Sequence, residues 1–372
     1  MFGLLLSLLL TLGPAMGNPP DVAVAELRGI WITRWTYSSA DQVREIMDEV
    51  ASAGFNTVYF QVRGQHDAFY ASDIEPWAKE LTGTLGKDPG WDPLAIAVQA
   101  GHERGLLVHA YLNAFPMWRG EAPPTQSTPE HVWHSDPDWV VADIEGMPMP
   151  LNEGYIYASP GNPEVRARLA AVAADIDKRY AVDGIHLDHI RYPDAHFGRD
   201  LVAMAAWEKD GRPHFGDWRR AQVTQSVSEV QHAVSVPVSA AVWGVYTNHW
   251  GWPEVSAGRT GYFQDADAFT RTGAADALIP MTYWPVNPGG RLDFVALTKD
   301  HVSRANGRHV YAGVRADSEM GIERLIQTIE ASREAGANGV VVFEYTGARE
   351  WFGVLRERVF QHPAVPPEMT WR

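Results

Sequence analysis

Short apolar runs alternate with amphipathic stretches along most of this chain. Eight apolar runs have the length and the β-branched and aromatic content of buried strands, at 27–34, 57–63, 106–113, 184–189, 237–243, 277–284, 309–316 and 339–345. Helical patterns lie between them at 41–53, 93–104, 163–179, 216–232, about 264–272, 292–304 and 321–335, and a last helix is predicted at 347–360. Strands that alternate with helices indicate a parallel sheet.

Eight strand–helix units match the size of an α/β fold, the (β/α)8 TIM barrel. The main alternative is a doubly wound open sheet, but no Gly-x-Gly-x-x-Gly follows the first strand, which weakens a dinucleotide fold. The long loop at 114–160, after the third strand, is the one large insertion, and such loops are usually functional. We expect a short linker at 18–25, one barrel domain over 26–362 and a tail at 363–372.

The first residues have the pattern of a signal peptide. Residues 2–13 are apolar, too few to span a bilayer, and the small residues Ala15 and Gly17 follow them. We therefore expect a signal peptide over 1–17 and an exported protein, periplasmic or extracellular. No Lys or Arg precedes the apolar run, which is unusual for such a signal. No later segment is apolar enough to predict a membrane span.

Composition narrows the classes of partner. The chain has no Cys, which excludes disulfides and thiolate metal sites. Its net charge is −15 and it has no basic run, so we expect no nucleic-acid partner. We expect a monomer. The 15 Trp exceed what a core needs, and several fall in predicted loops, where flat rings can bind sugars: Trp77, Trp91, Trp118, Trp133, Trp139, Trp250 and Trp252.

The segment Asp183–Pro193 (DGIHLDHIRYP) carries the strongest chemical signal. Alternation along a strand places His186 and Asp188 on one side of it and the apolar residues on the other. In a parallel barrel, the polar pair would face inward near the C-terminal mouth, where such barrels place their chemistry. Asp188 is the first candidate for a catalytic carboxylate. The alternative is a structural role, in which Asp188 orients Arg191 or His186.

The same alternation predicts further inward polar side chains near the strand ends. They are Gln61, Arg63, His109, Tyr111, Asn113, Tyr283, Arg315, Asp317 and Glu344. Because barrel interiors are normally apolar, this set indicates a polar pocket. Glycoside cleavage needs two carboxyl groups, or one and a substrate acetamide. Glu344, in an apolar run that would raise its pKa, is the first candidate partner for Asp188, and Glu75 and Asp317 are the others; for each, a loop salt bridge is the alternative.

The loop that follows the second predicted strand suits hydroxyl recognition, because it combines charged residues with aromatic ones. The residues expected to bind substrate are Arg63, His66, Asp67, Tyr70, His109, Tyr111, Asn113, His186, Arg191, Tyr283 and Arg315, with Trp77, Trp118 and Trp284 stacking on sugar rings. The histidines lack the His-x-His or His-Glu-x-x-His spacing of a metal site, so we expect no metal and no other cofactor.

Six ordered motifs resemble glycosyl hydrolase-like family 10, bacterial envelope-associated barrels related to glycoside hydrolases. They are Glu26–Thr33, Asp67–Ser72 with Glu75–Trp77, Trp91–Leu94, Gly105–Asn113, Asp183–Pro193 and Pro280–Pro285. The resemblance implies a TIM-barrel glycosidase that acts on cell-wall glycan, such as peptidoglycan strands stripped of their peptides, and it makes Asp188 the essential carboxylate. His189 stands where many members carry a second Asp, a departure that bears on activity.

A more distant similarity to family 18 chitinases serves as a contrast. Their Asp-x-x-Asp-x-Asp-x-Glu motif matches at Asp183 and Asp188, and their Tyr matches at Tyr283, but His186 and Ile190 replace the middle Asp and the Glu. The proton donor of a chitinase is therefore absent here. We expect a secreted glycoside hydrolase; the alternatives are an envelope-glycan-binding barrel without turnover and a different, metal-assisted hydrolase.

Overall fold

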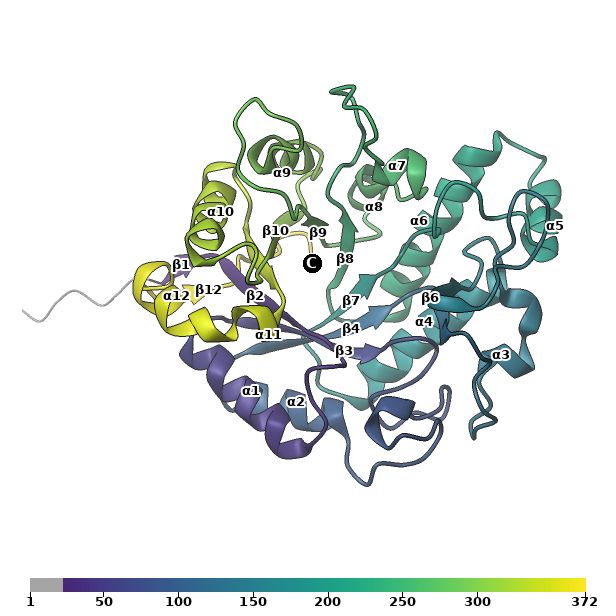
Figure 1. Ribbon diagram of the computed structural model, residues 1–372, viewed down its shortest axis with the longest axis horizontal. Helices are drawn as coiled ribbons and strands as arrows, with labels where there is room; N and C mark the ends of the chain where they lie inside the picture. The colour runs from purple at the N-terminus through teal and green to yellow at the C-terminus, as the bar shows by residue number, and fades with distance from the viewer. Residues whose placement is uncertain (1–22) are drawn as a thin grey trace, which may run out of the picture.

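The computed structural model describes residues 23–372, and eight parallel strands in it form a closed barrel (Figure 1). Around the barrel the strands are β2 (Leu27–Ile32), β3 (Thr57–Arg63), β4 (Leu107–Asn113), β7 (Gly184–Asp188), β8 (Val238–Trp243), β9 (Ala277–Met281), β10 (His309–Arg315) and β11 (Gly339–Phe343). Strand β11 pairs with β2 and closes the barrel. Each predicted strand corresponds to one barrel strand, so the predicted TIM barrel is confirmed.

Helices surround the barrel in Figure 1. The longer ones are α1 (Ala40–Ser52), α2 (Pro93–His102), α4 (Pro163–Arg179), α5 (Leu201–Lys209), α6 (Phe215–Ala233), α9 (Phe294–Ser303) and α10 (Ile322–Glu334); α8 (Ala266–Arg271) and α12 (Phe352–Arg358) are shorter. Their starts follow the sequence signals, because Ser39 caps α1 by accepting from the backbone N–H of Gln42, and Asp92 caps α2. After α1 the chain turns at Gly54, whose φ of 90° favours glycine.

The segment 114–160 has its own secondary structure. Strand β5 (Pro116–Gly120) pairs antiparallel with β6 (Asn152–Tyr157), and the short helix α3 (Val132–Ser135) lies between them. The predicted long loop is therefore a folded insertion. Its strand β6 supplies Tyr155, which lines the pocket at the mouth of the barrel.

The opposite end of the barrel is covered by the C-terminal residues. Strand β1 (Val24–Ala25) pairs with β12 (Ala364–Val365) beside the start of β2. Further along, Met369 packs against side chains inside the barrel, and the indole Nε1 of Trp371 donates to Asp276, which precedes β9. The C-terminus accordingly lies near the centre of the barrel in Figure 1.

The N-terminal predictions fall largely outside this description. The predicted signal peptide and most of the linker at 18–25 precede residue 23 and lie outside the described residues. None of the helices in residues 23–372 combines the length and the hydropathy needed to cross a bilayer.

Candidate active site

A pocket of about 270 Å³ opens where several barrel strands end. Its lining residues are Trp31, Thr33, Arg34, Trp35, Gln61, Tyr111, Asn113, Tyr155, Asp188, His189, Arg191, Met281, Tyr283 and Phe343. We call it the Asp188 pocket. Of the residues predicted to be catalytic or to bind substrate, it brings together Asp188, Tyr111, Asn113, Arg191 and Tyr283. Alternation predicted the inward side of Tyr111, Asn113, Asp188 and Tyr283, while Arg191 lies in the loop that follows β7.

Asp188 is held in its ionised form. One carboxylate oxygen accepts from the hydroxyl of Tyr111 at 2.8 Å, and the other accepts from the backbone N–H of His189 at 2.6 Å. Arg191 Nη1 lies 3.6 Å from the same carboxylate. Burial alone would raise the pKa of Asp188, but His189, Arg191 and the two hydrogen bonds together lower it below its ordinary value. The pocket therefore contains a fixed negative charge at the end of β7.

His189 forms a wall beside that charge. Its φ of 48° is in the left-handed region, which a non-glycine residue adopts only when the surrounding contacts hold it. Nδ1 lies 2.5 Å from the hydroxyl of Tyr157, and the ring meets Tyr155 edge-on at 5.3 Å between centroids. Burial lowers the pKa of His189 to about 4, so the ring is neutral near pH 7. Alternation could not predict this position, because the left-handed turn ends the strand pattern.

Arg34 and Trp35 are pocket residues that the sequence reasoning missed. They lie just after the C-terminal end of β2, at the barrel end where the other strands also end. This position was the feature of the sequence that could have predicted them as pocket residues. The backbone N–H of Arg34 donates to Gln61 Oε1, and its Nη2 donates to the hydroxyl of Tyr155, each at 3.0 Å. The guanidinium of Arg34 lies 4.3 Å from the ring centre of Trp35.

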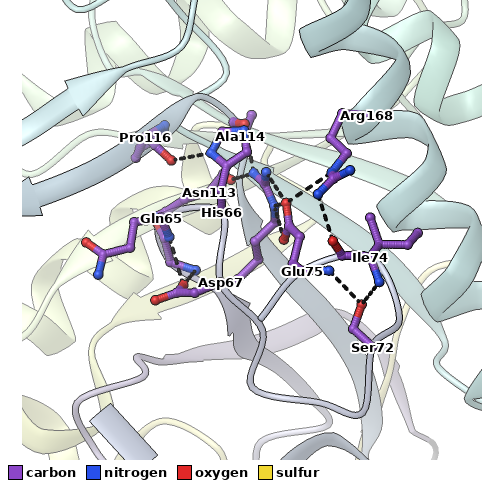
Figure 2. A network of polar contacts seen from close by, with 12 residues as sticks. Gln65, His66, Asp67, Ser72, Ile74, Glu75, Asn113, Ala114, Pro116 and Arg168 are labelled. Carbon is purple, nitrogen blue, oxygen red and sulfur yellow. Dashed lines mark hydrogen bonds and ion pairs between the residues drawn. The ribbon is translucent and has the colours of Figure 1, made fainter. Parts of the chain in front are cut away.

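Glu75, which Figure 2 labels, forms a buried ion pair with Arg63. Both side chains are fully buried, and Nη2 of Arg63 lies 2.7 Å from Glu75. Nη1 of Arg63 donates to the backbone oxygens of Asn113 and Ala114. The β3–β4 pairing shifts register between Gln61 and Arg63, so the alternation that predicted an inward Arg63 does not hold there. Their charges are already paired and neither residue lines the Asp188 pocket, so the predicted roles of Arg63 in binding and Glu75 in catalysis stay predictions.

Other residues of this loop also bind the protein itself. Nδ1 of His66 lies 3.0 Å from the backbone oxygen of Pro116, and Asp67 accepts from two backbone N–H groups of its own turn. His66, Asp67 and Tyr70 are almost completely buried. These side chains fix the shape of the loop and line neither the pocket nor the cleft beside it, so their hydroxyl-binding role stays a prediction. Trp77 is half-buried and lines neither the pocket nor the cleft beside it.

His109 and His186 face inward as predicted, but too deep to line the pocket. Nε2 of His186 lies 3.0 Å from the indole Nε1 of Trp31, and its Nδ1 lies 2.9 Å from Ser239 Oγ. The ring of His109 packs against Tyr59. Burial lowers the pKa of His186 to about 3 and that of His109 to about 4, so both are neutral core groups. Neither ring lines the pocket, so their predicted contacts with substrate stay predictions.

Glu344 and Asp317 line a different cleft, of about 720 Å³. Glu344 accepts from the backbone N–H of Gly347 and caps the short helix α11 (Tyr345–Ala348). Asp317 forms an ion pair with Arg315. Neither acid lines the Asp188 pocket, and the predicted pairing of Asp188 with one of them stays a prediction. Trp284 packs in an apolar cluster with Leu297 instead of lining the Asp188 pocket.

A larger cleft of about 1050 Å³ adjoins the Asp188 pocket, and Trp35 lines both. We call it the adjoining cleft. Trp118 lines it as well, with Lys79 Nζ 4.6 Å from its ring centre. At its inner side, Glu80 lies 4.0 Å from Arg34, and both oxygens of Glu80 are buried without a hydrogen-bond partner. Burial, with a further contribution from the nearby charge of Asp67, raises the pKa of Glu80 to about 7.

The arrangement also bears on metal chemistry. Within residues 23–372, no group of three or more His, Asp or Glu side chains is placed to hold a metal ion.

Residues 26–323 match the family described as glycosyl hydrolase-like 10. This chain belongs to that family. It is 30% identical over 287 residues to the glycosyl hydrolase YngK of Bacillus subtilis (strain 168), an alignment that covers 70% of this chain and 54% of YngK. It is 27% identical over 344 residues to the glycosyl hydrolase DigH of Escherichia coli (strain K12), covering 81% of this chain and 76% of DigH. The chain thus spans about half of the length of YngK.

Solved structures share the fold. The glycoside hydrolase domain of PgaB (BpsB) from Bordetella bronchiseptica superposes with a TM-score of 0.66 at 14% identity, over 90% of this chain and 98% of that domain. An α-L-fucosidase from Paenibacillus thiaminolyticus gives 0.61 at 15% identity, over 89% of this chain and 48% of the fucosidase. The family and the barrel therefore agree on a glycosyl hydrolase-like protein with a TIM-barrel fold.

Proposed function

We propose that this chain is an exported glycoside hydrolase that cleaves a cell-wall polysaccharide, such as peptidoglycan glycan strands without their peptides. The observation that supports it most directly is the ionised Asp188 in an aromatic pocket at the C-terminal mouth of the barrel. Membership of a glycosyl hydrolase-like family, and relatives named glycosyl hydrolases, support the reaction class.

The chemistry follows from the charge of Asp188. Glycoside cleavage develops positive charge at the anomeric carbon, which a fixed carboxylate stabilises. Asp188 is the one carboxylate among the residues that line its pocket, and its lowered pKa suits stabilisation rather than proton donation. A substrate acetamide would then be the nucleophile that displaces the leaving sugar at the anomeric carbon, and the oxygen of the leaving sugar would take its proton from water. An N-acetylated sugar is therefore the substrate type that we propose.

The first experiment is mass spectrometry of products after the purified mature protein is incubated with intact and peptide-stripped peptidoglycan. We expect new glycan fragments from the wild type and about a hundredfold to a thousandfold less from Asp188→Asn, because removal of one electrostatic catalytic group costs about 10²–10³ in rate. Asp317→Asn, which changes a carboxylate in a separate cleft, is the matched control and should keep wild-type activity. Equal product from wild type and Asp188→Asn would contradict the role of Asp188.

A second candidate function is glycan binding without turnover. It is favoured by the single carboxylate that lines the Asp188 pocket, since the two-acid mechanism has no second acid there. Calorimetric binding of peptide-stripped glycan by the wild type, with no product after prolonged incubation, would select this function.

Export is part of the proposal and rests on the apolar residues 2–13 and the small residues after them. Expression of the full chain in a bacterium, followed by fractionation and N-terminal sequencing, tests it. A mature protein that starts near residue 18 in the periplasm or the medium supports export, and an uncleaved protein in the cytoplasm contradicts it.

A further inference from the structure

Trp35 has an exposure that folding does not explain. Trp35 is the one Trp of residues 23–372 whose side chain is exposed, and 56% of its surface is in solvent. An exposed Trp leaves a large apolar surface unburied, and a ring of this kind at the edge of a pocket is typical of ligand contact.

The ring of Trp35 is held in place from below. The guanidinium of Arg34 lies over one face of the indole at 4.3 Å, a cation–π geometry. Arg34 is itself 1% exposed and is fixed by its hydrogen bonds to Gln61 and Tyr155. One face of the indole is therefore covered and supported, while the side chain as a whole remains more than half exposed. A supported flat ring loses little freedom when a sugar ring packs on it.

The position of Trp35 connects two cavities. It lines both the Asp188 pocket, of about 270 Å³, and the adjoining cleft, of about 1050 Å³. The cleft carries charged and polar side chains that can bind hydroxyl groups, among them Lys79, Arg119, Glu121 and Glu153. A polymer with one unit in the pocket therefore has a continuous path past the indole into a larger, polar-walled space.

We propose that Trp35 is the stacking platform of a second sugar-binding subsite, and that the ligand is an extended glycan bound across the mouth of the barrel. One unit would lie at Asp188, the next would stack on Trp35, and further units would occupy the adjoining cleft. This inference rests on the proposed function and extends it, because it assigns a chain of several sugars rather than a terminal sugar or a disaccharide.

The test measures binding as a function of chain length in Asp188→Asn, which avoids turnover. Calorimetry with chito-oligosaccharides of two to six units, and with peptide-free glycan strands of matched length, gives the dissociation constants. We expect affinity to rise with length, and Trp35→Ala in this background to weaken binding of the longest probes by about tenfold, with little change for the dimer. Trp35→Phe should retain most of the affinity, because it keeps an aromatic face.

Trp207→Ala in the same background is the matched control, since Trp207 of α5 packs against Phe215 and lines neither cavity. If binding does not depend on length, or if Trp207→Ala and not Trp35→Ala weakens the long probes, the subsite is overturned while the proposed function stands. If Asp188→Asn binds no probe of any length, and the wild type gives no product, both proposals fail together. Circular dichroism of each variant shows whether a loss of binding reflects a loss of fold.

Discussion

Two acidic residues near the mouth of the barrel, Asp188 and Glu80, have pKa values that are shifted in opposite directions. Asp188 has a lowered pKa because Arg191, a backbone N–H and a hydroxyl oppose the cost of burial. Glu80 has a pKa raised to about 7, because burial and Asp67 outweigh the attraction of Arg34. Close to neutral pH, the mouth of the barrel therefore has one permanent negative charge and one that changes with pH.

Glu80 should make stability depend on pH. A carboxyl group whose pKa is higher in the folded than in the unfolded state stabilises the fold fully at a pH below its unfolded pKa of about 4.5. This stabilisation is lost as the pH rises through the folded pKa of about 7. Glu80→Gln does not ionise, so its stability relative to the wild type should increase by up to about 3 kcal/mol between pH 4.5 and pH 8.5.

Urea denaturation of both proteins at these two pH values measures that difference. Glu153→Gln, which removes an exposed carboxylate from the same cleft, is the control and should show little change. A constant difference between Glu80→Gln and the wild type across the range would show that Glu80 titrates normally.

At the scale of elements, the loop between β3 and α2 is fixed by a buried ion pair rather than by apolar packing alone. Arg63, at the end of β3, binds three groups that Figure 2 labels by residue: the carboxylate of Glu75 in the loop and the backbone oxygens of Asn113, the last residue of β4, and of Ala114. Arg168 of α4 donates to the backbone oxygen of Ile74 in the same loop. The pair thus connects two neighbouring strands, the loop and, through that loop, a helix of the outer layer.

Glu75→Gln should destabilise the protein by about 3–5 kcal/mol, because it leaves the Arg63 charge buried without its partner. Chemical denaturation monitored by circular dichroism measures the change. Glu319→Gln, which removes the exposed partner of Arg315, should cost less than about 1 kcal/mol. If both substitutions have similarly small effects, then water or a local rearrangement compensates the buried charge of Arg63 in Glu75→Gln.

The sequence predicted strands better than it predicted contacts. Short apolar runs predicted all eight strands, and period-two alternation predicted the inward side of Tyr111, Asn113 and Asp188. It could not show depth, so His109 and His186 were assigned to a pocket that lies above them. It also could not show a register shift at Arg63 or a left-handed turn at His189, since both depend on contacts with distant segments.

At the scale of the whole molecule, the C-terminal residues act as a cover for the base of the barrel. Met369 packs against interior side chains, while Trp371 and Arg372 both donate to Asp276. The ring of Trp371 also meets His309 edge-on at 4.7 Å. These contacts cover the end of the barrel that lies away from the Asp188 pocket.

Removal of residues 366–372 should lower the midpoint of thermal unfolding by several degrees, because each kcal/mol is worth roughly 2–4 °C in a large domain. Calorimetry of the truncated and full-length proteins measures the shift. Chito-oligosaccharide affinity should be unchanged, since the deleted residues line neither the pocket nor the adjoining cleft. An unchanged midpoint would mean that the cover contributes no stability.

The pairing of Val24–Ala25 with Ala364–Val365 places both ends of the described chain on the face opposite the mouth. A protein immobilised on a resin through a linker after Arg372 would therefore present its mouth to the surrounding liquid. Long polymers could approach the pocket from the free side, while the support stays behind the barrel. For this fold, C-terminal attachment is the orientation of choice for a reusable glycan-processing or glycan-capturing column.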